Sequence, residues 1–211
     1  MLGFYIYVIM HPVARFFSKK ERCILEVEPI RDLKKIAVIK KILRAGNTRD
    51  ELLFIVGINT ALRISDLLSL SIGDVVDERG KIVEAIGMRE KKTGKMKKFP
   101  LNRSIKDALG GYLKEREGAD HSEPLFPSRK GGALSRWQAR RILSTAGDAV
   151  GVTRIGTHSL RKTFGYHVYR KTGGNLGLVQ KLLNHSSSAD TLRYIGIDRE
   201  QMDNTYLDLN L

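Results

Sequence analysis

The residues best suited to chemistry on a phosphate lie in one basic stretch near the C-terminal end of the chain. This stretch carries His158 and Arg161 three residues apart, then His185 and Tyr194 nine residues apart. It contains no acidic residue between positions 149 and 189. A solvated surface normally mixes both charges, so one sign of charge together with histidines and tyrosines predicts a polyanionic ligand and acid–base chemistry on it.

Chemistry on a phosphodiester requires a nucleophile, cations that hold the non-bridging oxygens, and a proton donor for the leaving oxygen. One route supplies these functions with Mg²⁺ ions held by clustered carboxylates. The basic stretch offers no such cluster, which disfavours a two-metal nuclease. The other route uses arginine and histidine directly, and the sequence therefore predicts a reaction without a metal or another cofactor.

Taken alone, each of these residues also has an ordinary structural explanation. His158 and Arg161 fit a capped helix with surface charges, and His185 fits a turn where a capping histidine is common. A lone tyrosine such as Tyr194 more often packs than reacts. Arg63 lies among apolar residues, which predicts partial burial, and Asp66 three residues later is its candidate partner.

Composition limits the class of protein. The chain has 211 residues and 42% hydrophobic residues, enough for one domain with a short appendage. Lys and Arg number 37 against 23 Asp and Glu, and the sequence pI near 10.0 is typical of a nucleic-acid binder. Anionic membranes and acidic proteins remain alternatives on charge alone. The apolar run 2–10 is shorter than the ~20 residues that span a bilayer, and the single Cys23 indicates a reducing, cytoplasmic compartment.

Periodicity predicts a mainly helical α+β fold with one small antiparallel sheet. Helices are expected from residue 30 to Gly46, from Asn47-Thr48 onward, and from residue 63, with Ser65 as the cap, to a turn at Gly73-Asp74. Residues 80–101 predict two or three antiparallel strands with a tight turn at Thr93-Gly94. A helix over 102–117, a proline- and glycine-rich loop to 135, and a mostly helical remainder complete the pattern. Residues 1–28 are irregular, and the stretch 1–20 is expected to pack on the body as a strand or short helix.

The order of these residues resembles the tyrosine recombinase (phage integrase) family. One box of that family is similar to "NTALRISDLLSL", and the others to "HSLRKTF" and "LLNHSSSADTLRY". The spacing from His185 to Tyr194 matches, as does Thr191 three residues before the tyrosine. The segment "EKKTGKMKKFPL" resembles the family's β-hairpin. The resemblance covers residues 30 to 195 and implies the catalytic-domain fold of that family.

The resemblance implies which residues bind the scissile phosphate. Arg63 and Arg161 would hold its non-bridging oxygens, a task that suits the planar fork of arginine. His185 would donate a further hydrogen bond to the same phosphate. Asp66 occupies the position of an acidic residue that orients the first arginine.

The resemblance also implies the covalent chemistry. Tyr194 would attack phosphorus and form a 3′-phosphotyrosyl link without metal or ATP, while His158 assists proton transfer. Lys92, with Lys91 as the alternative, would protonate the 5′-oxygen that leaves. Basic side chains of the hairpin and of the C-terminal half are expected to contact DNA: Lys91, Lys95, Lys97, Lys98, Arg136, Arg140 and Lys162.

Three positions depart from the family pattern. Ala61 stands where glycine is usual, which matters if the backbone there has positive φ. Asn184 also replaces a glycine, and asparagine tolerates left-handed geometry. Lys162 stands where a second histidine is common and is expected to face DNA. These departures remove no catalytic group, so the resemblance implies an active enzyme.

The expected organisation is an appendage over 1–28 without a complete core-binding domain, a catalytic domain over 29–195, and a tail over 196–211. The tail docks either on its own domain or on a neighbouring protomer. The implied function is a bacterial site-specific DNA recombinase of a phage or other mobile element. It would act on the nucleoid as a homotetramer on double-stranded DNA, with accessory DNA-bending proteins and no membrane. The alternatives are a DNA-binding regulator that lacks turnover and a generic RNA- or membrane-binding protein.

Overall fold

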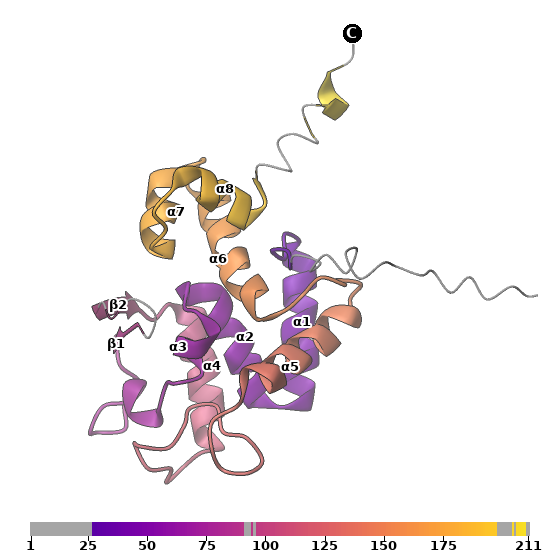
Figure 1. Cartoon of the computed structure of the whole chain (residues 1–211). Coiled ribbons are helices and arrows are strands. Elements are labelled where there is room, and N and C mark those ends of the chain that lie inside the picture. Colours follow the sequence, from indigo (N-terminus) through magenta and orange to yellow (C-terminus); the bar gives the residue numbers. More distant parts are fainter. Residues whose placement is uncertain (1–26, 91–93, 95, 198–203, 205, 210–211) are drawn as a thin grey trace, which may run out of the picture.

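The computed structural model describes residues 27–90, 94, 96–197, 204 and 206–209, and most of them are helical (Figure 1). The elements in chain order are α1 (Leu33–Gly46), α2 (Thr48–Thr60), α3 (Ile64–Leu67), a short 3₁₀ turn η1 (Ile72–Asp74), β1 (Ala85–Arg89), β2 (Met96–Pro100), α4 (Arg103–Lys114), α5 (Arg136–Asp148), α6 (Thr157–Lys171), α7 (Leu176–Leu183) and α8 (Ser188–Ile195). Strands β1 and β2 form a two-stranded antiparallel sheet. The predicted fold class, mainly helical with one small antiparallel sheet, is confirmed.

Short polar side chains start most of the long helices. Asn47 ends α1 and begins α2, since its side chain accepts a hydrogen bond from the Arg49 backbone N–H. Asn102 and Ser135 cap α4 and α5 in the same way. These caps satisfy backbone donors that have no partner within the helix. The predicted helix start at Asn47-Thr48 and the predicted end at Gly46 are both confirmed.

The predicted turn at Gly73-Asp74 agrees with η1, but the helix predicted between residue 63 and that turn is wrong in length and in its cap. Helix α3 covers four residues, and Arg63 occupies its N-cap position in an extended conformation, so Ser65 lies inside the helix. Tertiary hydrogen bonds take over the backbone beyond it, because Leu125 N donates to Leu70 O at 2.8 Å and Ile72 N donates to Glu123 O at 2.9 Å. Pairing with this distant loop outweighs the local helical pattern.

The hairpin β1–β2 has the register that its apolar residues require. Ile86 faces Phe99, and both are buried, whereas Gly87 and Lys98 pair one position further along. One face therefore packs on the core and the other carries basic residues. Gly94 has φ +66°, which agrees with the predicted turn, and Thr93 lies outside the described residues.

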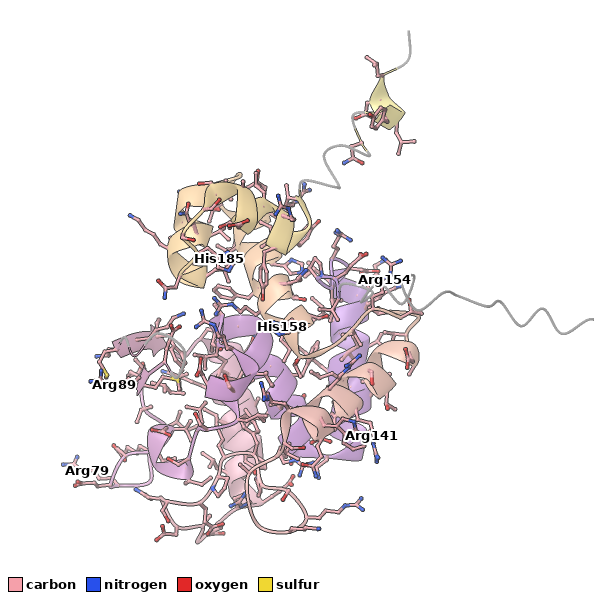
Figure 2. All side chains as sticks on the ribbon, viewed as in Figure 1. Arg79, Arg89, Arg141, Arg154, His158 and His185 are labelled. Atoms are coloured by element: carbon pink, nitrogen blue, oxygen red, sulfur yellow. The ribbon has the colours of Figure 1, made fainter. Side chains whose placement is uncertain are left out.

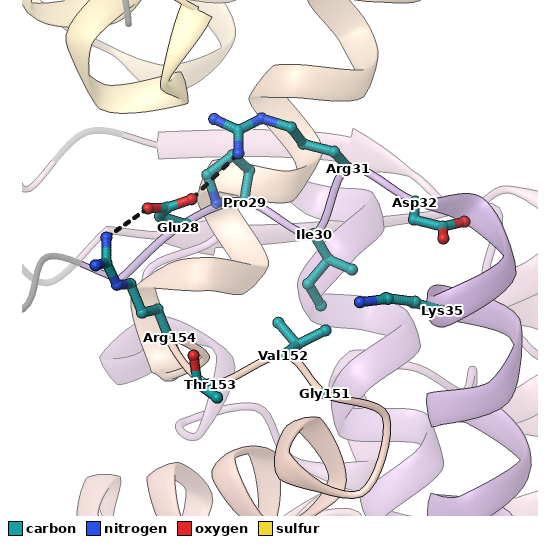
Figure 3. Close-up of a pocket in the computed structure, with 10 residues that line it drawn as sticks. All are labelled: Glu28, Pro29, Ile30, Arg31, Asp32, Lys35, Gly151, Val152, Thr153 and Arg154. Carbon is teal, nitrogen blue, oxygen red and sulfur yellow. Dashed lines mark hydrogen bonds and ion pairs between the residues drawn. The ribbon is translucent and has the colours of Figure 1, made fainter. Parts of the chain in front are cut away.

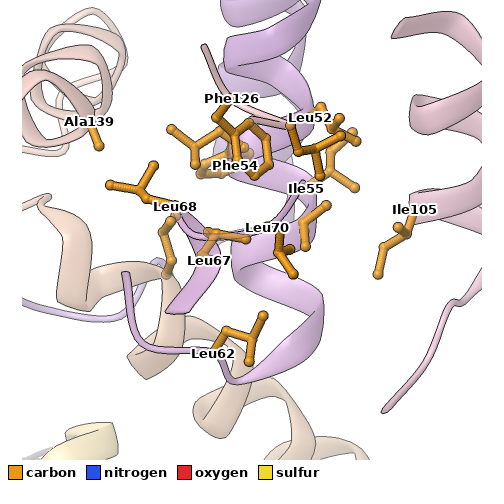
Figure 4. Packing of buried hydrophobic residues seen from close by; sticks show 14 of the residues in the cluster. Leu52, Phe54, Ile55, Leu62, Leu67, Leu68, Leu70, Ile105, Phe126 and Ala139 are labelled. Atoms are coloured by element: carbon orange, nitrogen blue, oxygen red, sulfur yellow. The ribbon is translucent and has the colours of Figure 1, made fainter. Parts of the chain in front are cut away.

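The main hydrophobic cluster surrounds α2, whose side chains from Leu52 to Val56 are all buried (Figure 4). Helices α1, α4 and α6 pack around α2, and the loop residue Phe126 is fully buried in the same cluster. A smaller second cluster joins α6, α7 and α8 around Tyr166, Leu183 and Ile195. In Figure 1, α7 and α8 accordingly lie together at one end of the molecule.

Two glycines let α6 approach its neighbours closely. A Cβ on Gly57 of α2 would collide with the side chain of Leu160, and a Cβ on Gly165 would lie 2.7 Å from Cγ2 of Ile195 in α8. Helix α6 therefore contacts the main cluster through one end and the second cluster through the other. It is the element that fixes α8 relative to the main body.

The N-terminal strand or short helix predicted before residue 27 lies outside the described residues. Among the residues that are described, no helix combines the length and the apolar character needed to cross a bilayer.

Candidate functional site

Residues from four segments line one pocket where the main body meets the α7–α8 part. Arg63 lies at the start of α3, and His158 and Arg161 lie in the first turns of α6. His185 and its neighbours form the turn between α7 and α8. Figure 2 shows His185 in the α7–α8 part and His158 in the adjoining part of the main body, and both line the pocket. The lining residues are Arg63, His158, Arg161, Asn184, His185, Ser186, Asp190 and Tyr194.

Arg161 is the buried centre of this site, with 3% of its surface exposed. Its Nη1 donates to Ala61 O at the end of α2, and its Nη2 donates to Leu183 O at the end of α7. Carbonyl groups at helix C-termini have no partner within the helix and carry partial negative charge. The guanidinium therefore links two helix ends, and its five N–H donors exceed the two that these bonds use.

Both helix ends that receive Arg161 require a left-handed residue. Ala61 has φ 55° and Asn184 has φ 51°, and within the described residues they are the two non-glycine positions with positive φ. The sequence suggested this geometry at both positions because glycine is usual there in similar proteins. The turns are needed to aim the carbonyls of Ala61 and Leu183 at Arg161.

Replacing Asn184 with valine is expected to lower the free energy of unfolding by about 1–2 kcal/mol, because a β-branched residue is strained at positive φ. The side chain is exposed, so the change removes little packing. Asn184→Gly, which relieves the same constraint, should match or exceed the wild type. Urea denaturation of the three proteins checks this, and equal stability of the valine and glycine variants would contradict it.

Arg63 is paired with a carboxylate that the sequence analysis missed. Its Nη1 lies 3.1 Å from Oε2 of Glu90, whose side chain is 2% exposed. Asp66, the predicted partner, is fully buried in α3, and its charge acts to raise the pKa of Arg161 against the lowering by burial. Glu90 is the one acidic residue between positions 85 and 106, which is the signal that could have drawn attention to it.

Lys97 of β2, predicted to contact DNA, is largely buried beside the pocket. Its Nζ donates to Leu182 O at 3.0 Å and lies 3.8 Å from Oε1 of Glu90. Burial lowers the pKa of Lys97 below its usual value, and the nearby charge of Arg161 lowers it further. Lys97 therefore joins β2 to the end of α7.

His185 and Tyr194 pack edge to face, with ring centroids 4.9 Å apart. Nδ1 of His185 lies 3.2 Å from Oγ1 of Thr191, whose hydroxyl donates to Ser187 O at 2.8 Å. Because that hydroxyl proton is used, Nδ1–H of His185 donates to Thr191, and Nε2 is the nitrogen available to a ligand. Burial lowers the pKa of His185, and the charges of Arg161 and Arg63 lower it further.

The pKa of His158 is also lowered, first by burial and then by the charges of Lys162 and Arg161. A histidine whose charged form is disfavoured is suited to accept a proton near neutral pH. The assistance of His158 in proton transfer stays a prediction.

Lys162, which is expected to face DNA, lies beside Tyr194 in the site. Lys162 is 5% exposed, and its Nζ lies 5.1 Å from the centroid of the Tyr194 ring. Its position in α6 explains this, because the residues from Ser159 to Thr163 are all buried between the two clusters. The ammonium group therefore contacts the face of the predicted nucleophile.

The remaining predicted positions divide by location. Lys91, Lys92 and Lys95 lie outside the described residues. The side chains of Lys98 in β2 and of Arg136 and Arg140 in α5 are exposed. Trp137, which sequence reasoning did not single out, follows Arg136 in α5 and is 66% exposed. The Cζ atom of Arg141 lies 5.4 Å from the centroid of the Trp137 ring. Among the described residues, no group of three or more histidine, cysteine or acidic side chains is arranged to hold a metal.

A second cavity lies away from this site, between residues 28–35 and the loop Gly151–Arg154 (Figure 3). Glu28 pairs there with Arg31 at 3.1 Å and with Arg154 at 2.9 Å. Arg31 also donates to Gly196 O just after α8. These contacts fasten the segment before α1 to the end of the helix that carries Tyr194, and none of the predicted catalytic residues lines the cavity.

Comparison with known proteins identifies similar chains. The model of the "Phage integrase family" matches residues 32–201. A probable integrase/recombinase of Bacillus subtilis (YoeC) is 45% identical over 82% of this chain and 92% of its own length. The type 1 fimbriae regulatory protein FimE of Escherichia coli K12 is 34% identical over 71% of this chain and 75% of its own length.

Solved structures show the same fold at lower identity. The XerA recombinase has a TM-score of 0.67 and 23% identity over 88% of this chain. The XerH recombinase bound to its difH DNA has a TM-score of 0.65 and 23% identity over 86% of this chain. This chain spans 66% of the XerA chain and 53% of the XerH chain, so each has parts without a counterpart here.

Proposed function

Because the chain belongs to the phage integrase family and is a tyrosine-type site-specific recombinase, we propose that Tyr194 cleaves double-stranded DNA and forms a 3′-phosphotyrosyl link. The observation that carries this proposal is the pocket itself. Two arginines, two histidines and Tyr194, taken from distant parts of the sequence, line one cavity. Such a set supplies a nucleophile, phosphate ligands and a proton acceptor in one place.

Arg161 and Arg63 would bind the non-bridging oxygens of the scissile phosphate. Arg161 is fixed by the carbonyls of Ala61 and Leu183, and Arg63 by Glu90. Neither has to reorganise while negative charge develops in the transition state, which is the condition for effective electrostatic stabilisation. His185 would add a hydrogen bond from Nε2.

The Tyr194 oxygen would attack phosphorus while the bond from phosphorus to the 5′-oxygen breaks. His158 would receive the tyrosine proton, and the predicted donor to the leaving oxygen is Lys92. The phosphotyrosyl bond stores the energy of the broken link, so a 5′-hydroxyl from another strand can reverse the step. The reaction therefore balances without ATP.

A nicked suicide substrate tests this proposal. Duplexes drawn from the DNA that flanks the gene would be incubated with the protein in EDTA, and covalent adducts resolved on a denaturing gel. We expect an adduct on the 3′-phosphate fragment, and mass spectrometry should map it to the peptide that contains Tyr194. DNA that is shifted on a native gel without any adduct, across several flanking sites, would favour a binding regulator instead.

DNA binding at pH 7 is expected to take up protons at His185. In the free protein its pKa is lowered, so the ring is largely neutral, with Nδ1–H bonded to Thr191. To donate from Nε2 to a phosphate the ring must be charged, and the anion favours that form. The pKa therefore rises on binding, and a proton is gained between the free and bound values.

Calorimetry in buffers of different ionisation enthalpy measures this uptake. His185→Gln should reduce it, and His121→Gln, a change at an exposed position, should leave it unchanged. Equal uptake by wild type and His185→Gln would contradict the assignment of the ring nitrogens.

The wider assignments are also part of the proposal. The chain would act as a bacterial recombinase of a phage or other mobile element, associated with the nucleoid and assembled as a tetramer on DNA with accessory bending proteins. Residues 29–195 would form the catalytic domain, flanked by an appendage over 1–28 and a tail over 196–211. Light scattering of the DNA complex tests the tetramer, and a mass of one protomer per site would oppose it.

A further inference from the structure

Glu90 is a buried carboxylate beside a site that must bind a negatively charged phosphate. It follows the last residue of β1, and its Oε2 accepts from Nη1 of Arg63 at 3.1 Å. Only 2% of the side chain is exposed. A carboxylate near a phosphate repels it, and burial of an ionised group is costly unless cations surround it. The cost of burying the Glu90 carboxylate next to a phosphate site must therefore be offset by a favourable interaction that this carboxylate makes.

Arg63 needs a partner that fixes its direction. It occupies the N-cap position of the short helix α3, where the backbone is extended and the side chain forms no cap. A long guanidinium side chain loses considerable rotamer freedom when it is held in one orientation. A charged hydrogen bond to a rigid carboxylate can hold it there before DNA arrives.

Lys97 connects this pair to the other half of the site. Its Nζ lies 3.8 Å from Oε1 of Glu90 and donates to Leu182 O at 3.0 Å. The next carbonyl along the chain, Leu183 O, receives Arg161. The groups that hold Arg63 and Arg161 therefore both contact the end of α7. Through Lys97, the β1–β2 hairpin is connected to the part of the molecule that carries His185.

We propose that Glu90 is a positioning residue that holds Arg63 for phosphate binding, with Lys97 locking Glu90 to the end of α7. This inference rests on the proposed function, because it assigns Arg63 to the scissile phosphate. It adds a residue to the reaction that the sequence resemblance does not name.

The isosteric change Glu90→Gln separates positioning from simple structural support. It keeps the shape and one acceptor but loses the charge that orients Arg63. Single-turnover adduct formation on a nicked phosphate substrate is expected to fall about 10- to 100-fold, the scale of a hydrogen bond to a charged group. Affinity for the DNA should change less than twofold, because other basic residues contribute most phosphate contacts.

A methylphosphonate at the scissile position provides the decisive comparison. A methyl group replaces one non-bridging oxygen, so the linkage carries no negative charge and depends less on a cation. If Glu90 acts through Arg63, the defect of Glu90→Gln should shrink at least fivefold on this substrate, in parallel with that of Arg63→Ala. Glu84→Gln, a change of an 88% exposed side chain just before the hairpin, is the matched control and should behave as wild type.

An equal loss on both substrates, or no loss on either, would overturn the role of Glu90. Lys97→Met should reproduce the phosphate-specific defect in weaker form, and an unchanged rate in that variant would remove Lys97 from the proposal. Failure of the proposed function would look different, because the wild-type protein itself would then form no adduct with either substrate.

Discussion

Tyr194→Phe is expected to bind DNA and form no covalent adduct. The substitution removes the oxygen that attacks phosphorus and leaves the ring in place. The edge-to-face contact with His185 and the contact with Lys162 both involve that ring and should persist. Removing a nucleophile typically lowers a rate by on the order of 10⁴-fold or more. The adduct should therefore fall below detection in the suicide-substrate assay.

The fold should tolerate this change, because Tyr194 is only partly buried and its ring keeps its apolar contacts with the second cluster. The free energy of unfolding is expected to stay within about 1 kcal/mol of the wild type. Tyr169→Phe alters another tyrosine packed on the same cluster and is the matched control. If Tyr194→Phe still forms an adduct, or if Tyr169→Phe abolishes it, Tyr194 is not the nucleophile.

Local chemistry explains why much of this fold could be predicted. Asn47, Asn102 and Ser135 each satisfy a backbone donor at a helix start, and that preference acts within a few residues. The three-residue spacing of His158 and Arg161 places both in the first two turns of α6, as the pattern indicated. Signals of this kind need no knowledge of the rest of the chain.

The features that sequence reasoning missed depend on distant contacts. Helix α3 ends early because the segment after it pairs with residues around Glu123 and Leu125. Glu90 contacts Arg63 although the two residues are 27 positions apart in the sequence, and no helical or strand periodicity relates them. Lys162 is buried because α6 packs against two hydrophobic clusters, so a position that looks like a surface lysine lies under Tyr194. In each case packing overrides the local preference.

The site also uses backbone geometry that the sequence suggested only indirectly. Ala61 and Asn184 take left-handed conformations that each end a helix. These ends present the carbonyls of Ala61 and Leu183 to Arg161. The hydrogen bonds from the charged guanidinium at these two helix ends offset part of the strain of a non-glycine residue with positive φ. The position of Arg161 thus depends on the ends of two helices that are far apart in sequence.

Arg161→Lys is accordingly expected to lower the rate of adduct formation by about 10²- to 10³-fold, the usual effect of removing a transition-state donor. A lysine ammonium carries the same charge, but it is a point donor without the planar fork. It cannot bond the carbonyls of Ala61 and Leu183 and a phosphate oxygen in one fixed geometry. Charge is retained, so affinity for DNA at low salt should change little compared with the rate.

The same substitution should reduce stability, because it leaves a buried carbonyl without its hydrogen bond. Each such loss costs about 1–3 kcal/mol, and urea denaturation would measure it. Arg170→Lys, at an exposed position in the last turn of the same helix, is the matched control and should change neither property. A rate loss that disappears once the folded fraction is corrected for would assign Arg161 a purely structural role. A loss of rate that remains after correction for the folded fraction would show that the two helix ends hold Arg161 in place for the phosphate.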